Sequence, residues 1–477
     1  MTLGKKAKWL YQEFGVSSVI LSGRDTWLVI LMRTCRMFAF GAVSLVFALF
    51  LSALGYSDVW IGFFLTATMA GEVVISLGIS LIADQVGRRR VLFFGAALMV
   101  ASGMIFIVFE NYWLLLLAAT IGVISATGGD YGPFRSIEES TLSHLTTAST
   151  RADVLSWYVT SASLGSAIGT EISGRIVKAL KDTDAKSVKD VYHAMFWVYV
   201  VAGVISMASS SLISKRAELQ QEKPAQSEVA VELAEPLLEE DEDEDEEHSQ
   251  PREPQKPIAP GQHKSWFAQM VENARLSGMS AETKSAVVKL WVLLTVDSLA
   301  DGMVSYGLTI YYLARKFDVS ESYLGDIMSI CYILMAISTI FASPLARRLG
   351  LVNTMVFTHI PSSAAVLLFP IPQSLPLTVV LLFIRTGLNN MDQGPRAALI
   401  AAIVKPEKRT AVMGITAMLR TLAGTLGPSI TGLLSSSNKF WVAYVLAGVL
   451  RLVYDFGLWY LFTGVNTSAD EEDEEDR

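Results

Sequence analysis

Residues 130–135 read DYGPFR and residues 392–396 read DQGPR, so one short motif occurs twice in this chain of 477 residues. In each copy an aspartate precedes a Gly-Pro pair, and an arginine closes the motif. The polar segment after each copy ends at a further arginine, Arg151 or Arg409. A motif that recurs together with its surroundings indicates an internal duplication.

The same duplication is visible earlier in each half. When Gly62 is aligned with Gly325, both halves carry a further glycine twenty-five residues later, at Gly87 and Gly350. Parallel repeats that enclose a site near the middle of the bilayer are one architecture of membrane carriers, because one half can move against the other.

The composition is that of a membrane protein. Hydrophobic residues make up 52% of the chain and charged residues 18%. Stretches 91–109, 194–213 and 327–346 contain no charged residue, and each has roughly the 20 residues that an apolar helix needs to cross a bilayer. The same reading along the chain predicts twelve spans, at about 26–54, 59–82, 91–109, 113–135, 152–177, 192–213, 286–314, 322–346, 351–370, 374–398, 410–434 and 439–463.

Two acidic runs lie outside the predicted spans. Nine consecutive acidic residues at 239–247 and seven at 470–476 supply sixteen of the forty-six acidic residues of the chain. The negative net charge of -8 therefore comes from these two runs and not from the predicted helices. Such segments are typical of solvated, disordered chain. We predict a cytosolic N-terminus at 1–25, a six-helix bundle at 26–213, an acidic disordered linker at 214–285, a second six-helix bundle at 286–463 and an acidic tail at 464–477.

Basic residues concentrate in alternate loops, for example at Arg88, Arg347 and Lys405. The positive-inside rule therefore places both termini and the linker in the cytosol. The loop after the fifth predicted span also carries lysines, although aspartates accompany them there. A plasma-membrane location and a vacuolar or other endomembrane location both fit this pattern.

The loop between the second and third predicted spans reads SLIADQVGRR at 80–89. It resembles the hallmark loop of the major facilitator superfamily, Gly-x-x-x-Asp-Arg/Lys-x-Gly-Arg-Arg/Lys, with Ser80 and Gln85 as departures. The resemblance covers about 26–213 and 286–463. It implies an all-α membrane protein of twelve transmembrane helices in two pseudo-symmetric six-helix bundles, which transports a solute by alternating access.

The resemblance also implies a cytosolic gate, in which ion pairs latch the two halves together when the cavity opens outward. The Asp130/Arg135 and Asp392/Arg396 sets are expected near the cytosolic ends of their spans, close to the hallmark loop. A plain brace at the helix ends is the alternative. The candidate gate residues are Ser80, Asp84, Gly87, Arg88, Arg89, Asp130, Pro133, Arg135, Asp392, Pro395 and Arg396.

Ionisable side chains at membrane depth are costly and are functional candidates by default. Arg33 and Arg36 share one face of the first predicted span, and Asp297 and Asp301 share one face of the seventh. Our hypothesis is that Arg36 and the two aspartates form a charged site whose pairing changes with substrate or with a proton. A static salt bridge between the halves is the alternative.

Further arginines are predicted near mid-membrane at Arg385, Arg420 and Arg451. Guanidinium groups suit carboxylates and phosphates, which favours an anionic or zwitterionic solute. Asp455 lies one turn from Arg451 and is expected to neutralise it. In the same way Glu171 is expected to neutralise Arg175.

Glu72 in the second predicted span has no evident partner in the sequence. Because burial favours the protonated form of a carboxyl group, Glu72 is a second candidate for proton exchange. A neutral glutamic acid that lies next to lipid or is hydrogen-bonded is the alternative.

The sequence contains no phosphate-binding glycine loop with a lysine, no zinc-ligand spacing and no nucleophile elbow. We therefore expect no enzyme, no cofactor, no metal and no nucleic-acid partner, but a monomer in the lipid bilayer with a small-molecule substrate. The leading interpretation is a secondary carrier coupled to a proton or solute gradient. The alternatives are a solute receptor that signals through the acidic linker and a drug/proton antiporter.

Overall fold

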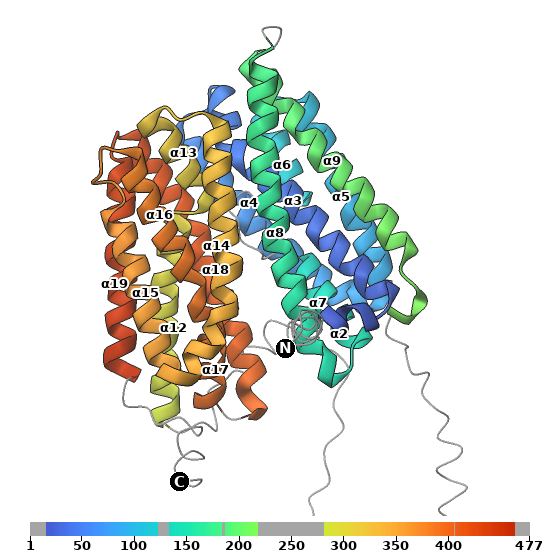
Figure 1. Ribbon diagram of the computed structural model, residues 1–477, viewed down its shortest axis with the longest axis vertical. Helices are drawn as coiled ribbons and strands as arrows, with labels where there is room; N and C mark the ends of the chain where they lie inside the picture. Colours follow the sequence, from blue (N-terminus) through green and yellow to red (C-terminus); the bar gives the residue numbers. More distant parts are fainter. Residues whose placement is uncertain (1–15, 123–132, 184–186, 218–280, 405, 463–477) are drawn as a thin grey trace, which may run out of the picture. The chain divides into compact units, whose positions relative to one another are not determined.

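The computed structural model describes residues 16–122, 133–183, 187–217, 281–404 and 406–462, and all of them belong to one compact unit. The described residues are helical apart from turns and short connections, as Figure 1 shows. The N-terminal half consists of α2 (Val16–Leu21), α3 (Arg24–Ala53), α4 (Asp58–Val86), α5 (Arg88–Val108), α6 (Tyr112–Ile121), α7 (Pro133–Leu145), α8 (Ala148–Lys181), α9 (Val188–Leu212) and the short 3-10 helix η1 (Lys215–Ala217).

The C-terminal half repeats this pattern of long antiparallel helices. It consists of α12 (Ala281–Met303), α13 (Tyr306–Phe317), α14 (Glu321–Leu349), α15 (Leu351–Leu368), α16 (Leu375–Asn389), η2 (Asn390–Asp392), α17 (Gln393–Ile403), α18 (Pro406–Ser436) and α19 (Phe440–Phe462). We call the end of the bundle at which α3 begins and α19 ends the terminal end, and the opposite end the distal end.

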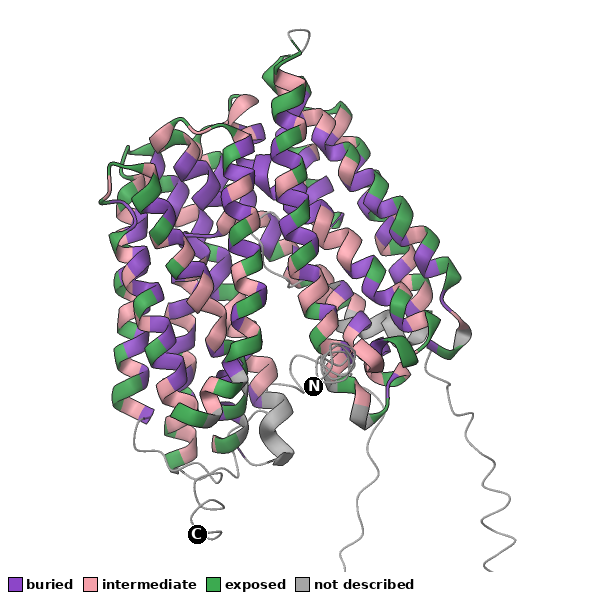
Figure 2. Cartoon of the chain, in the orientation of Figure 1, coloured by how far each residue is buried: buried purple, intermediate pink, exposed green. Residues whose placement is uncertain are grey.

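The fold is that of an integral membrane protein. Seven of the described helices are long and apolar enough to cross a bilayer, and α6 is a shorter apolar helix. Many large apolar side chains, such as Phe341 and Trp459, are exposed, and acyl chains solvate such groups better than water does. Figure 2 shows exposed residues along the outer helices. Helices lie at every position where the sequence predicted a span, although the predicted fourth, seventh and tenth spans are not continuous helices.

The predicted seventh span is broken between α12 and α13, at Val304 and Ser305. A break leaves backbone carbonyls without intrahelical partners, and these must be satisfied inside a membrane protein. The Thr431 hydroxyl donates to the carbonyl of Met303 over 2.7 Å, and Nη2 of Arg385 donates to the carbonyl of Val304 over 2.6 Å. Side chains from α18 and α16 therefore hold the break in place.

The tenth predicted span is also divided, into α16, η2 and α17, with the motif at 392–396 at the junction. The fourth is α6 followed by α7 after an interval outside the described residues. A proline within the first turn of a helix costs no hydrogen bond, and Pro133 begins α7 while Pro395 lies in the first turn of α17. The duplicated Gly-Pro pair thus marks the start of a helix segment in both halves.

The buried apolar residues form three clusters. The largest draws on both halves and includes Phe47 and Tyr312, which lie in the distal part of the bundle. Two smaller clusters lie toward the terminal end, one in each half, around Tyr158 and around Tyr454. The two halves therefore share one core distally and have separate cores at the terminal end.

Candidate functional site

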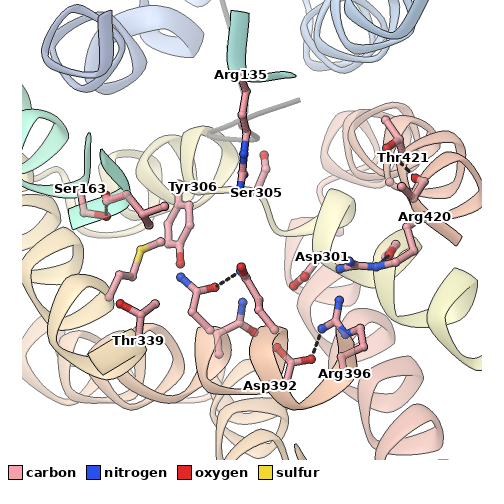
Figure 3. Close-up of a pocket in the computed structure, with 18 of the residues that line it drawn as sticks. Arg135, Ser163, Asp301, Ser305, Tyr306, Thr339, Asp392, Arg396, Arg420 and Thr421 are labelled. Atoms are coloured by element: carbon pink, nitrogen blue, oxygen red, sulfur yellow. Dashed lines mark hydrogen bonds and ion pairs between the residues drawn. The ribbon is translucent and has the colours of Figure 1, made fainter. Parts of the chain in front are cut away.

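A cavity of about 580 Å³ lies between the two halves. The N-terminal half contributes Arg33 and Ser166 to its wall, and the C-terminal half contributes Tyr306 and Arg420. The wall extends toward the terminal end as far as Ile400, which is in the last turn of α17. Figure 3 shows the polar side chains that face this space. A cavity between two halves that separate at one end is the arrangement that alternating access requires.

Arginine is the main charged residue of the cavity wall. The arginines are Arg33, Arg135, Arg385, Arg396 and Arg420, and the carboxylates are Asp301 and Asp392. Arg396 forms an ion pair with Asp392, one turn away on the same segment, and Nε of Arg135 lies 2.7 Å from Oε1 of Glu139. The wall therefore carries more positive than negative charge.

Two of these arginines have no carboxylate within ion-pair distance among the described residues. Nε of Arg420 donates to the Ser298 hydroxyl over 3.1 Å, and Arg385 donates to the Thr309 hydroxyl over 3.2 Å and to the Val304 carbonyl. Arg385 thus uses its terminal nitrogens to stabilise the helix break, whereas the remaining donors of Arg420 point toward the cavity. In Figure 3, Arg420 lies with Asp301 and Arg396 on one wall.

The expected site of Arg36 with Asp297 and Asp301 is wrong. Both terminal nitrogens of Arg36 bind the carboxylate of Glu138 on α7 at 2.6 Å, within the N-terminal half. Glu138 is fully buried and also accepts a hydrogen bond from the Tyr158 hydroxyl over 2.8 Å. The carboxylate of Glu138 binds both terminal nitrogens of Arg36 within the same half, so Arg36 does not pair with Asp297 or Asp301.

The expected pair of Arg451 and Asp455 is also wrong. Arg451 is fully buried, and its Nη1 pairs with Asp301 of α12. Its Nη2 donates to the Asn389 amide oxygen and lies 2.8 Å from Nε2 of His359. Asp455 is instead 2.6 Å from Nδ1 of His359.

The predicted pair of Glu171 and Arg175 is confirmed, with Nη2 of Arg175 2.7 Å from Oε1 of Glu171. The same nitrogen also lies 2.9 Å from Asp326 on α14, in the other half. The arginine side chain is 61% exposed, so water screens both contacts and each contributes little to stability. Arg175 therefore belongs to a contact between the halves as well as to a local pair.

The gate residues at the terminal end make local contacts in this conformation. Nη2 of Arg88 donates to the Ser140 hydroxyl over 2.8 Å, and Arg89 donates to the Ser211 carbonyl over 3.3 Å. Gly87 has a φ of 99°, which favours glycine at the start of α5. Asp130 and the side chains of Ser80, Asp84 and Pro133 lie outside the described residues. The function of these residues as a latch remains a prediction.

Glu72 is 2% exposed in α4, and its Oε1 makes no hydrogen bond within the described part of the chain. It does not line the cavity. The burial agrees with the reasoning from sequence, and a part in proton exchange stays a prediction.

Contacts at the distal end join the two halves. Asp58 of α4 pairs with Arg315 of α13 at 2.5 Å and accepts a hydrogen bond from Ser435 of α18 over 2.6 Å. On the other side Glu321 of α14 pairs with Lys181 of α8. These contacts hold the distal end closed while the cavity lies on its terminal side.

Close helix packing supports this closure. A Cβ added at Gly62 of α4 would lie 2.4 Å from the carbonyl oxygen of Pro428 on α18. A contact this short with backbone cannot be relieved by a side-chain rotation. Gly62→Ala is therefore expected to separate α4 from α18 and to open the distal end.

The test is the labelling rate of a cysteine introduced at Ser163, which lines the cavity, by an impermeant maleimide applied from the distal side. The native Cys35 and Cys331 are replaced by alanine beforehand. We expect Gly62→Ala to raise the rate about tenfold, which corresponds to about 1.4 kcal/mol. Gly78→Ala on the same helix is the control, because its added Cβ would meet no atom within 4 Å. Equal rates in the two variants would contradict this account of the closure.

Reasoning from sequence missed three residues that the structure places in these networks. Glu138 was overlooked because the fourth span was predicted to end before it. His359 and Asn389 lie in predicted spans nine and ten, but neither carries a formal charge at neutral pH. A histidine at membrane depth is the signal that could have found the second network.

The chain is similar in sequence to known membrane proteins. A sequence model of the Major Facilitator Superfamily matches residues 29–277 and 290–476. The "Uncharacterized membrane protein YJR124C" of Saccharomyces cerevisiae is 33% identical over 453 residues, which cover 94% of this chain and 97% of the yeast protein.

Solved structures share the fold. A bacterial homologue of the human lysosomal transporter Spinster, in an inward-facing and unoccupied conformation, has a TM-score of 0.65 at 14% identity over 95% of this chain and 98% of its own. The nucleoside transporter NupG has a TM-score of 0.65 at 12% identity over 93% of this chain and 100% of its own. At such low identity these likenesses concern the fold alone.

Proposed function

Because the chain belongs to the Major Facilitator Superfamily, and is thus a secondary transporter and not an enzyme, we propose that it carries a small organic anion by alternating access. Transporters of different solutes share this fold, so the proposal for the substrate rests on the cavity. The single observation that carries it is the excess of arginine in the cavity wall, and above all Arg420, which forms no ion pair with the residues that the structure describes.

The charge of the cavity wall favours binding of an anion over binding of a cation. A cation in this cavity would face five arginines and two carboxylates, and both carboxylates are already held by arginines. An anion would find a guanidinium with free donors, and a planar guanidinium binds a carboxylate or phosphate through two parallel hydrogen bonds. Tyr306 and Tyr332 add aromatic surface to the cavity wall, and the ring of Tyr306 lies against the guanidinium of Arg385.

The closed distal contacts and the cavity on the terminal side support an inward-facing state, if the termini and the linker are cytosolic as the basic loops predict. In this state the solute would exchange with the cytosol. The gate residues of the terminal end would then pair across the halves only in the opposite state.

The experiment is a thermal-shift comparison of four probes that share a benzene ring and differ in charge. They are benzoate, benzamide, benzylamine and phenylalanine, which are an anion, a neutral amide, a cation and a zwitterion. A ligand that binds the folded state raises the unfolding temperature by mass action. We expect benzoate to stabilise the purified protein at lower concentration than benzamide, and benzylamine not to stabilise it.

The carrier function is tested separately, by uptake of radiolabelled benzoate into proteoliposomes that contain only this protein. Accumulation would support the carrier, whereas binding without uptake would favour a solute receptor. Stronger stabilisation by benzylamine than by benzoate would contradict the anionic substrate.

A further inference from the structure

A histidine is buried in the C-terminal half, where α12, α15 and α19 pack together. His359 of α15 is 2% exposed, and its two ring nitrogens have different partners. Nδ1 lies 2.6 Å from Oδ1 of Asp455, and Nε2 lies 2.8 Å from Nη2 of Arg451.

These partners determine which nitrogen carries the hydrogen. A guanidinium group can only donate, so Nε2 of His359 must accept from Arg451. The ring hydrogen is then on Nδ1 and is donated to Asp455. Asp455 accepts a second hydrogen bond from the Ser363 hydroxyl over 2.6 Å, as an ionised carboxylate does. His359 is therefore neutral here, and Arg451 occupies its one lone pair.

A second carboxylate faces the same nitrogen without being bonded to it. Oδ1 of Asp297 lies 3.6 Å from Nε2 of His359. Asp297 is 1% exposed, and neither of its oxygens accepts a hydrogen bond from the residues that the structure describes. A buried carboxylate without a donor is costly. A hydrogen on Nε2 would supply the donor that Asp297 lacks.

We propose that His359 and Asp297 form a proton-binding site, and that a proton and Arg451 compete for Nε2 of His359. His359 lines the cavity, so water there can deliver the proton. The proton adds to the Nε2 lone pair, the Nδ1 hydrogen stays with Asp455, and the imidazole becomes a cation that donates to Asp297. Arg451 gives up this one hydrogen bond and keeps Asp301 and Asn389.

The charged and titratable groups around His359 come from every helix packed against this site. They are Asp297 and Asp301 from α12, Arg385 from α16, Asp392 from η2, Arg396 from α17, Arg420 from α18, and Arg451, Tyr454 and Asp455 from α19. Protonation adds one positive charge to this group. It therefore raises the affinity of the cavity for an anion, and by linkage a bound anion raises the affinity for the proton. This coupling, a proton–anion symport, rests on the proposed function, whereas the proton site does not.

The proton site is tested without any ligand, by nitrogen NMR of the ¹⁵N-histidine-labelled protein in nanodiscs. The chain has five histidines, and His359→Gln identifies the signal of His359. We expect wild-type His359 to be neutral with its hydrogen on Nδ1 at about pH 6, in the range where histidine titrates. In Arg451→Gln the lone pair is free, so the protonated fraction at the same pH should rise roughly tenfold.

Two further variants separate this competition from simple charge removal and from misfolding. Arg396→Gln removes a nearby positive charge that makes no hydrogen bond to His359, so its effect should be clearly smaller than that of Arg451→Gln. Asp297→Asn keeps an acceptor oxygen but removes the negative charge that faces the added hydrogen, so it should lower the protonated fraction at about pH 5. A wild-type His359 with its hydrogen on Nε2, or equal effects of the two arginine variants, would overturn the proposal.

The coupling has its own readout. Benzoate should stabilise the wild-type protein at lower concentration at about pH 5.5 than at about pH 7.5, and His359→Gln should remove this difference. His144→Gln is the control, because His144 is exposed at the end of α7. If benzoate does not bind at all, the proposal of an anionic substrate is rejected. The NMR result still tests the proton site independently.

Discussion

Replacing Glu138 with alanine is expected to destabilise the protein by about 3–5 kcal/mol, because it leaves a buried positive charge without its partner. Both terminal nitrogens of Arg36 bind Glu138 at 2.6 Å, and the Tyr158 hydroxyl loses its acceptor in the same substitution. The arginine side chain is 12% exposed, so water cannot replace the carboxylate. The measurement is the free energy of unfolding from a titration with sodium dodecyl sulfate in mixed micelles.

The neighbouring residue provides a matched control. Glu139 pairs with Arg135 at 2.7 Å, but its side chain is 38% exposed and that of Arg135 is 42% exposed. Glu139→Ala should therefore change the free energy of unfolding by about 1 kcal/mol or less. The double variant Arg36→Met with Glu138→Met should recover most of the loss, because it removes both buried charges. Equal effects of the two glutamate variants would show that burial does not determine the strength of the pair.

Replacing Arg420 with glutamine should abolish the preference for an acid over its amide. Arg420 has no carboxylate partner among the described residues and, unlike Arg385, is not bonded to the carbonyl at the helix break. Truncating one member of a desolvated charge pair costs at least about 2 kcal/mol. We expect the ratio of benzoate to benzamide affinity, measured by thermal shift, to fall at least about 30-fold. Arg420→Lys keeps the positive charge but not the two parallel donors. Its ratio of benzoate to benzamide affinity should lie between those of the wild type and of the glutamine variant.

The control for Arg420 is Arg216→Gln, which removes an exposed arginine near the end of the N-terminal half. It should leave the ratio unchanged. The unfolding temperature without ligand shows whether Arg420→Gln is folded, since among the described residues Arg420 makes one hydrogen bond, to Ser298. If folded Arg420→Gln still prefers benzoate as strongly as the wild type does, Arg420 is not the residue that binds the anion.

The helices could be predicted from the sequence because lipid imposes a simple requirement, about 20 apolar residues per span. The pairing of the buried charges could not, because it depends on which helices face each other. Arg451 and Asp455 are one turn apart in sequence, yet each finds a better-placed partner on another helix, Asp301 and His359. Proximity along a helix predicted Glu171 and Arg175 correctly, where both side chains reach solvent and no buried group competes.

The break in the seventh span was hidden from the sequence for a related reason. Val304 and Ser305 are not residues that end helices by themselves, and the two nearest glycines, Gly302 and Gly307, lie within α12 and α13. What stabilises the break is tertiary, namely the donors that Arg385 and Thr431 bring from other helices. Such partners are visible only when the helices are assembled.

Because of this break, two helix segments, α12 and α13, make the contacts that one continuous span would otherwise make. α13 carries Arg315, which closes the distal end, and α12 carries Asp297 and Asp301, which face the buried histidine and the cavity. Arg385 and Thr431 bind the backbone where the two segments join, so the pair of Arg315 with Asp58 and the pair of Asp301 with Arg451 belong to separate pieces of helix. We therefore expect that breaking the distal pair of Arg315 leaves the pair of Asp301 and Arg451 in place.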